Sequence, residues 1–362
     1  MTNWQNELQK IRPLDAAIMK EAKELWDSRT HPIGSLGLCE ELTIQLCGIR
    51  EELVKSAHPR GIAVMCADNG VIEEDVSSSP QVFTYLLANA MASGQTGVST
   101  LAAFQDTEVF VVNIGILPAG DYHPNVYQMV VREGTRNCAK EPALTREEVI
   151  EAIGVGFDLA KSCAEKGFVM LGTGELGIAN TTTSSAVLAA LTGWDVADCV
   201  GLGAGITSRQ MENKVRVIGE ALDFHKPIPE DAIDVLAKVG GLDLAGLTGV
   251  FLGCAVYRMG AVIDGIISTV AAIAATRLAP GVKDFLFASH LSEEAAAKNS
   301  LAYLGLEPLA RLHMRLGEGS GCPFTFTILD HSLYSLWNMG TFQSTDIQNT
   351  LLVNIRDKGE DQ

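Results

Sequence analysis

Short runs of consecutive hydrophobic residues alternate along the chain with longer stretches rich in alanine and leucine. Continuous hydrophobic runs are typical of strands buried on both faces of a parallel sheet. The alternation of strands with helices therefore predicts an α/β fold in which helices cover both faces of the sheet. We expect strands at 61–67, 109–114, 168–171, 199–202, 261–264 and 285–288. We expect helices at 85–104, 146–166, 181–192, 208–223, 266–278 and 292–304, and a helical segment at 14–49 that is interrupted at 31–37.

The length and charge of the chain narrow the classes of function. With 362 residues, of which 47% are hydrophobic, the chain is long enough for one large domain, alone or with a small one. The 27 basic and 44 acidic residues give a net charge of −17, which argues against a nucleic-acid-binding surface. A small anionic substrate is still compatible with this charge, because a helix N-terminus and one or two basic residues bind a phosphate locally.

The cysteines and the hydrophobic segments predict a cytoplasmic protein that does not enter a membrane. Eight cysteines are scattered without a C-x-x-C pair, which is typical of reduced, mostly buried thiols. The polar N-terminus lacks the hydrophobic segment of a signal peptide. The most hydrophobic window, Gly260 to Pro280, contains Asp264 and Arg277, so a buried strand and helix explain it better than a membrane span. No spacing of histidine and cysteine is typical of a zinc site, and we expect neither a metal nor another cofactor.

The turns that follow the predicted strands contain most of the candidate chemistry, because such sheets bind ligands at the carboxyl ends of their strands. After the run that ends at Leu171, the chain reads GTGELGIANTTT and then enters a helix. The glycines allow backbone N–H groups to approach an anion, and Asn180 to Thr183 offer hydrogen-bond donors at the helix start. The spacing alone fits an anion site and an ordinary glycine-rich turn equally well. Glu175 favours a functional site, because packing does not require an acid among these glycines.

Two further turns each contain one charged residue of interest. In GLGAGITS (201–208) and the following MENKV (211–215), Lys214 is placed to bind a phosphate oxygen, although a solvated position is the commoner role of a lysine. In MRLGEGSG (314–321), Glu318 lies between two glycines. A partly desolvated carboxylate there would suit general-base catalysis, and a surface acid in a flexible loop is the alternative.

The remaining polar turns and motifs favour no other chemistry. Asp68 to Val71, with the downstream VSSSPQ (76–81), offers an acid and hydroxyls at the same sheet edge, which ordinary turn chemistry explains equally well. His290 follows a hydrophobic run, but a structural role is commoner there than metal binding. The chain has no G-x-S-x-G elbow, no H-E-x-x-H and no kinase signature.

Eight segments, in order from about residue 12 to about residue 350, together match one known family. The longest are GLEPLARLHMRLGEGSG (305–321) and HPIGSLGLCEELTIQL (31–46). The others are CADNGVIEEDVSSSP (66–80), GELGIANTT (174–182), ENKVRV (212–217), KVGGLDLAGLTG (238–249), SHLSEE (289–294) and NMG (338–340). The chain thus resembles the nicotinate-nucleotide:dimethylbenzimidazole phosphoribosyltransferases of cobalamin synthesis.

The resemblance implies both an architecture and a reaction. It implies a Rossmann-like large domain at 60–304 and a small, mainly helical domain built from both chain ends, 1–59 and 305–362, in a dimer. It implies transfer of phosphoribosyl from nicotinate mononucleotide to a cobamide lower-ligand base, which gives an α-ribotide phosphate and nicotinate. Nicotinate is held in the donor as a pyridinium group, so its departure needs little acid help. One carboxylate that takes the acceptor's proton therefore suffices, without a metal or redox cofactor.

The resemblance also assigns roles to individual residues. Glu318 occupies the position of the general base, and Glu175 that of a supporting carboxylate near the incoming base. The residues that match the base pocket are Ser79, Leu176 and Leu316. The residues that match nucleotide- and phosphate-binding positions are Gly177, Asn180, Thr181, Gly203, Lys214 and Ser289, the last at the dimer-facing edge of the site.

Departures from the family pattern leave the acceptor open. The usual Asp-His-Gly is Asp68-Asn69-Gly70 here, and a basic residue is replaced in Thr30-His31-Pro32-Ile33. After Glu318 the chain continues with CPFTFTILDHSLY (322–334), which is bulkier and more aromatic than the family pattern. These rings either line the acceptor pocket or belong to a repacked helix. The acceptor is dimethylbenzimidazole, another benzimidazole, adenine, phenol or p-cresol, and the chain forms a homodimer or a heterodimer with a paralogue. A non-catalytic paralogue that stabilises an active partner is the alternative class of function.

Overall fold

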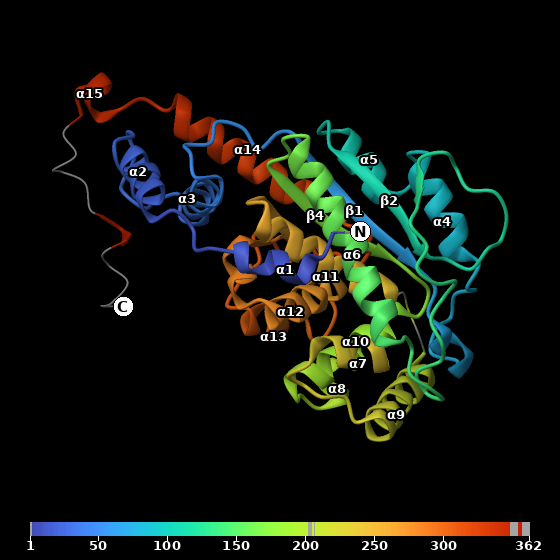
Figure 1. Cartoon of the computed structure of the whole chain (residues 1–362). Helices are drawn as coiled ribbons and strands as arrows, with labels where there is room; N and C mark the ends of the chain where they lie inside the picture. The colour runs from blue at the N-terminus through green and yellow to red at the C-terminus, as the bar shows by residue number, and fades with distance from the viewer. Residues whose placement is uncertain (1, 202–204, 206, 348–353, 357–362) are drawn as a thin grey trace.

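The computed structural model describes residues 2–201, 205, 207–347 and 354–356, and a six-stranded parallel sheet lies at its centre (Figure 1). The strand order is β3-β2-β1-β4-β5-β6, and every neighbouring pair is parallel. The chain order changes direction between β1 and β4, which makes the carboxyl ends of these strands the expected ligand site. The strands are β1 (Arg60–Ala67), β2 (Glu108–Gly115), β3 (Val126–Gln128), β4 (Met170–Leu176), β5 (Gly260–Ile263) and β6 (Leu286–Ala288).

Helices cover both faces of the sheet, so the predicted α/β class is confirmed. The helices near the chain ends are α1 (Trp4–Glu7), α2 (Ala16–Asp27), α3 (Leu38–Arg50), α13 (Ala297–Tyr303), α14 (Cys322–Asn338) and α15 (Phe342–Thr345). The others are α4 (Phe83–Ala92), α5 (Gly97–Ala103), α6 (Arg146–Glu165), α7 (Asn180–Thr192), α8 (Val196–Cys199), α9 (Ser208–His225), α10 (Ala232–Val239), α11 (Leu242–Val256) and α12 (Ile266–Leu278).

The two faces can be assigned from the side chains of β1. Ile62 packs against Gly319, in the turn before α14, whereas Met65 packs against Gly246 of α11. These two positions are three residues apart and so point to opposite faces of the strand. Helices α4, α5 and α14 accordingly lie on one side of the sheet in Figure 1, and α6 and α11 lie on the other.

Five of the six predicted strands are present, and one prediction is wrong. Cys199 does not begin a strand but ends α8, because the Asp195 side chain accepts a hydrogen bond from the Ala197 N–H and caps that helix. The rest of the predicted run reaches into residues outside the described ranges. The sequence also missed β3, a three-residue edge strand with exposed side chains at Tyr127 and Gln128, which leave no hydrophobic run to detect.

The helix expected at 85–104 is two helices, α4 and α5, separated at Ser93–Thr96. The sequence did not predict α11, in which every side chain is buried. Glycines in a sequence usually indicate turns, but the glycines of α11 allow it to pack closely against α6. A Cβ placed on Gly156 of α6 would lie 1.8 Å from the Gly246 carbonyl oxygen of α11. The two helix backbones therefore pack in direct contact.

Helices from both chain ends meet beside the sheet. The predicted break at 31–37 separates α2 from α3, and the Trp26 Nε1–H donates a hydrogen bond to Thr43 Oγ1 at 2.7 Å between them. Helix α14 packs against α3, and Arg356 forms ion pairs with Asp27 and Glu40. The division into a domain at 60–304 and a second domain built from both ends stays a prediction.

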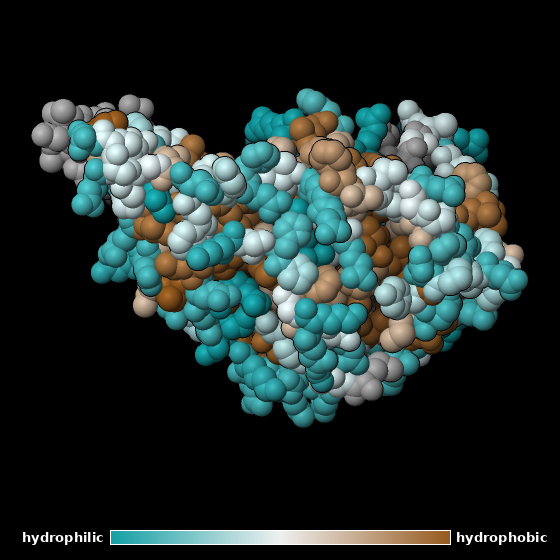
Figure 2. Space-filling model, turned by 90° about the horizontal axis from the view of Figure 1, so that it is seen from above, coloured by the Kyte–Doolittle hydropathy of each residue, from teal (hydrophilic) through white to brown (hydrophobic). Residues whose placement is uncertain are grey.

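The surface is mainly hydrophilic on the face that Figure 2 shows. Figure 2 shows one face on which hydrophilic residues predominate and hydrophobic residues gather in separate patches. Within the described ranges, no helix is both long enough and apolar enough to cross a membrane.

Candidate active site

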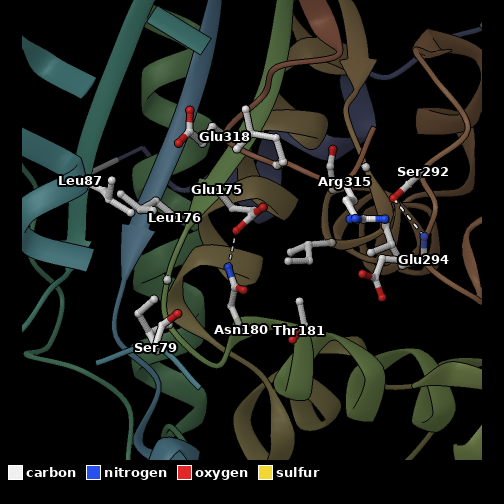
Figure 3. A pocket seen from close by; sticks show the side chains of 18 of the residues that line it. Ser79, Leu87, Glu175, Leu176, Asn180, Thr181, Ser292, Glu294, Arg315 and Glu318 are labelled. Carbon is white, nitrogen blue, oxygen red and sulfur yellow. Dashed lines mark hydrogen bonds between the residues drawn. The ribbon is translucent and has the colours of Figure 1, made fainter. Parts of the chain in front are cut away.

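A pocket of about 270 Å³ opens at the carboxyl ends of the strands, where the chain order of the sheet changes direction (Figure 3). Its walls come from β4 and the turn into α7, from α4, from the start of α12 and from the turn before α14. Eight residues predicted for the site line it. They are Ser79, Glu175, Leu176, Gly177, Asn180, Thr181, Leu316 and Glu318.

One side of the pocket is apolar and suits a planar aromatic ring. Phe83 and Leu87 reach it from α4, and Leu176 and Leu316 face the same space. Leu316 is 56% exposed, so a ring bound against it would remove apolar surface from contact with solvent. Apolar walls with a few polar groups are typical of small-molecule sites.

Glu318 lies at this apolar end and is held by an unusual backbone. Its side chain is only 8% exposed, so the alternative of a surface acid does not hold. The φ angles of Gly317, Glu318 and Gly319 are +79°, +64° and +90°, a left-handed run that non-glycine residues rarely adopt. Glu318 Oε2 accepts a hydrogen bond from the Val98 N–H at 3.2 Å, at the start of α5. Glu318 is therefore held both by its backbone conformation and by the hydrogen bond to its carboxylate.

The Glu318 turn rests directly on β4. A Cβ on Gly174 would lie 2.4 Å from the Glu318 carbonyl oxygen, a distance that packing does not allow. The glycine of the GELG motif is thus required because the turn sits on it. This contact brings Glu318 and Glu175, which are far apart in the sequence, to the same pocket.

The carboxyl group of Glu175 has a raised pKa. Burial raises the pKa of its carboxyl to about 8, and the charges of Asp243, Asp264 and Glu318 act in the same direction. The Asn180 Nδ2–H donates a hydrogen bond to Glu175 Oε2, which partly offsets this effect. No basic side chain in the described ranges forms an ion pair with Glu175. The carboxyl therefore keeps its proton at neutral pH.

The opposite end of the pocket is polar, with Arg315 in its lining and Lys214 buried behind Thr181. Lys214 of α9 is 1% exposed, and its Nζ donates a hydrogen bond to Thr181 Oγ1 at 2.8 Å, so the solvated alternative does not hold. Burial lowers the pKa of Lys214 to about 8. Figure 3 shows Arg315, Ser292 and Glu294 on this side, away from Glu318 and Leu87. A buried ammonium behind a hydroxyl at the start of α7 suits an anionic group.

Of the remaining predicted positions that the structure describes, Ser289 and Asp68 do not line the pocket. Ser289 is 2% exposed and donates a hydrogen bond to the Asp264 carbonyl at 2.9 Å, so it lies behind the pocket wall. Gly203 falls outside the described ranges. The Leu117 N–H donates a hydrogen bond to Asp68 Oδ2 at 2.8 Å.

The sequence missed several lining residues. Arg315 lies three residues before Glu318, inside a segment that had been singled out, and its charge was a usable signal. Phe83 and Leu87 carried no such signal, because hydrophobic residues on a helix usually indicate core packing. Glu294 lay in the SHLSEE segment without an assigned role.

The aromatic segment after Glu318 does not reach the pocket. No residue of α14 lines it, and Phe326 is fully buried in the core. The rings belong to a repacked helix, which was one of the two alternatives. Among the described side chains, no group of three or more His, Cys, Asp or Glu residues could hold a metal ion.

Comparisons with known proteins agree along nearly the whole chain. A family model described as phosphoribosyltransferase matches residues 11–347. The chain is 42% identical over 351 residues to a nicotinate-nucleotide–dimethylbenzimidazole phosphoribosyltransferase of Clostridium perfringens, and these cover 97% of each protein. It is 41% identical to the enzyme of the same name from Geobacter metallireducens, over the full length of both.

A solved structure has the same fold. The structure of CobT from Thermus thermophilus superimposes with a TM-score of 0.86 at 33% sequence identity. The match covers 92% of this chain and 99% of that one.

Proposed function

The chain belongs to the nicotinate-nucleotide–dimethylbenzimidazole phosphoribosyltransferase family, and on this premise we propose how its pocket performs the transfer. The enzyme moves phosphoribosyl from nicotinate mononucleotide to a lower-ligand base. The bond between ribose C1′ and the nicotinate nitrogen breaks, a bond from the acceptor to C1′ forms, and Glu318 takes the acceptor's proton. One observation carries the proposal: a single pocket has Glu318 against an apolar wall at one end and Thr181, bonded to Lys214, at the other.

The two carboxyl groups have different tasks in this mechanism. A general base contributes roughly 10²–10⁴-fold to such a step, and Glu318 is the carboxylate that lies at the apolar wall. Glu175 holds a proton at neutral pH, because its pKa lies near 8. It therefore supports the reaction as a hydrogen-bond donor and not as a second base. Nicotinate leaves with a neutral ring nitrogen, so no acid is needed at the donor.

The polar end binds the phosphate of the donor. Thr181 offers a hydroxyl at the start of α7, Lys214 stands directly behind it, and Arg315 lines the same region. Asn180 has its amide engaged with Glu175, so its contribution to nucleotide binding is indirect. Holding the donor here and the acceptor at the apolar wall aligns the two reacting atoms, which is a large part of catalysis.

The acceptor is an aromatic ring of benzimidazole size or smaller. The apolar wall of Phe83, Leu87, Leu176 and Leu316 suits dimethylbenzimidazole, another benzimidazole, adenine, phenol or p-cresol. A phenol hydroxyl has a pKa near 10, by analogy with tyrosine, so Glu318 would act on it through a bridging water. Ser79 offers a hydroxyl that distinguishes acceptors by hydrogen bonding.

A partner subunit covers the apolar edge of the pocket in this proposal. Phe83, Leu86 and Leu87 of α4 are 36–50% exposed beside the site, and a paired subunit would bury them. The partner is a second copy of the chain or a paralogue, and a mass measurement of the native complex separates the two. The eight cysteines are free thiols, which supports a location in the reducing cytoplasm.

An acceptor screen tests the proposal. The protein is mixed with nicotinate mononucleotide and each acceptor in turn, alone and with any paralogue encoded beside it, and released nicotinate is measured. We expect release that depends on the acceptor, with a benzimidazole among the substrates. No release with any acceptor, alone or paired, would contradict catalysis and favour a non-catalytic subunit that stabilises an active partner.

A further inference from the structure

A second buried carboxylate holds the turn that carries Glu318. Asp264 follows β5, is 3% exposed, and is not among the residues that line the pocket. Its Oδ2 accepts a hydrogen bond from the Gly319 N–H at 3.0 Å, and its Oδ1 accepts one from the Gly321 N–H at 2.7 Å. Gly319 follows Glu318 directly in the backbone, and Gly321 lies three residues after it. The position of Glu318 therefore depends on Asp264.

Asp264 is itself fixed to the sheet edge. Its backbone N–H donates to Ser268 Oγ at 3.2 Å, at the start of α12. Its carbonyl oxygen accepts from Ser289 Oγ at 2.9 Å, just after β6. These bonds anchor Asp264 to two neighbouring segments. Asp264 therefore fixes the position of the Glu318 turn relative to the sheet.

Burial raises the pKa of Asp264 to about 7, and the hydrogen bonds from the Gly321 and Gly319 N–H groups oppose this shift because they stabilise the charged form. The imidazole of His290 lies 3.9 Å from Asp264 Oδ1, and burial lowers the pKa of this histidine, so it is neutral at neutral pH. Charge-assisted hydrogen bonds from N–H groups to a buried carboxylate are roughly twice as strong as neutral ones. An amide in this position would accept with only one atom and would turn its own NH₂ toward a donor.

The Glu318 turn needs such an outside support. Three successive residues, Gly317 to Gly319, have positive φ, and the middle one is not glycine. A left-handed glutamate is disfavoured by local sterics and persists only where the surroundings impose it. The contact with Gly174 fixes the turn from below, and the Asp264 bonds fix it from the side.

We propose that Asp264 is a positioning residue for proton transfer, which acts by holding the Glu318 turn in the shape that presents the carboxylate to the acceptor. The inference rests on the proposed role of Glu318 as the general base. Asp264 lies behind the pocket wall, so it acts through the Gly319 and Gly321 amides and not on the donor or the acceptor.

The test begins with D264N. Displacing a catalytic group by about 1 Å costs on the order of 10²-fold, so we expect kcat to fall by about 10- to 100-fold. The affinity for nicotinate mononucleotide, measured by calorimetry, should stay within about threefold, because the phosphate end is built separately. A wild-type kcat would overturn the inference, and so would a loss of donor affinity equal to the loss of kcat.

A double-mutant cycle with E318Q identifies the route of the effect. If Asp264 acts through Glu318, the double variant D264N/E318Q should be no slower than E318Q alone. Multiplied effects would mean that Asp264 acts by another route, and would overturn the inference while leaving Glu318 as the base. If E318Q itself keeps the wild-type rate, the base assignment fails, and the inference about Asp264 fails with it.

Two further variants control for folding. E40Q makes the same carboxylate-to-amide change at another buried site, in α3, and should lower the Tm without lowering kcat. Should D264N not fold, D264E keeps the charge but moves it by one methylene. It should lower kcat with unchanged donor affinity, and a wild-type kcat in D264E would also overturn the inference.

Discussion

The two ends of the pocket are built in different ways. At the apolar end, backbone geometry places Glu318, through a left-handed turn that rests on Gly174 and is held by Asp264. At the polar end, the positive charge is placed by a long side chain. Lys214 is buried on α9, and its ammonium group reaches Thr181. A backbone-fixed group suits a proton transfer that depends on small distances. A buried ammonium suits binding of a charged substrate. Substitutions at the two ends should therefore change different kinetic constants.

The largest difference between the change in kcat and the change in KM is expected for E318Q. Glutamine has the shape of glutamate but cannot take a proton, so kcat should fall at least about 100-fold. The KM for nicotinate mononucleotide should change by less than about threefold, because the phosphate end is intact. Steady-state rates at saturating acceptor measure both constants. An unchanged kcat would move the base role to Glu175 or to water.

The opposite pattern is expected for K214A. Loss of a charge-assisted contact to phosphate costs about 1.5–3 kcal/mol, so the KM for nicotinate mononucleotide should rise roughly 10- to 100-fold. The kcat at saturating donor should fall far less than in E318Q. Lys226 is exposed and carries the same charge, so K226A is the matched control and should leave both constants unchanged. A fall in kcat without a change in KM would contradict the division of the pocket.

The pH dependence of donor binding sharpens this prediction. The pKa of Lys214 is about 8, so the residue is charged below this pH and loses its proton as the pH rises through it. The KM for nicotinate mononucleotide should therefore rise above pH 8, by up to about tenfold per pH unit. The K214A variant should lose this dependence. A KM that falls with rising pH would contradict the assignment.

A smaller effect is expected for E175Q. Glu175 is protonated at pH 7, because its pKa is about 8, so glutamine imitates its neutral form and kcat should stay within about tenfold. Its effect on stability has a definite sign. The folded protein keeps this proton up to pH 8, whereas the unfolded chain releases it near pH 4.3, so wild-type stability falls as pH rises between them. The Tm of E175Q should fall less from pH 5 to pH 8. An equal fall in both proteins would contradict the raised pKa.

The smallest effect is expected for Y334A. Tyr334 is 71% exposed on α14 and lies in the aromatic segment that does not line the pocket. Relative kcat/KM values across the acceptor panel should change by less than about twofold, because specificity depends on contacts inside the pocket. A shift in acceptor preference would mean that α14 contributes to acceptor recognition.

Most of the fold could be predicted because buried parallel strands are continuous hydrophobic runs. The exceptions have physical reasons. The edge strand β3 has three residues, of which two are exposed, so it leaves no such run. Helix α11 is buried on all sides, and its glycines, which let it touch α6, look like turn signals. The run at 199–202 was hydrophobic without being a strand at Cys199, because a side-chain cap nearby favoured a helix.

The site could be predicted where one segment carries the whole signal. Glu318 and Glu175 each lie in a glycine-rich motif, and the structure brings both motifs to one pocket. Asp264 could not be found in this way, since its role depends on bonds to backbone atoms more than fifty residues away. The pocket residues of α4 could not be predicted either, because the wall of an apolar pocket and a hydrophobic core have the same sequence pattern.

The place of Glu318 in the chain has a consequence for synthesis. The last strand of the sheet ends at Ala288, and Lys214 and Thr181 precede it. Glu318 follows thirty residues later, on a turn that needs the finished sheet beneath it. A ribosome therefore synthesises Thr181 and Lys214 of the phosphate end well before Glu318, whereas Arg315, three residues before Glu318, is added together with the proposed general base. The proposed general base is thus among the last parts of the pocket to be synthesised.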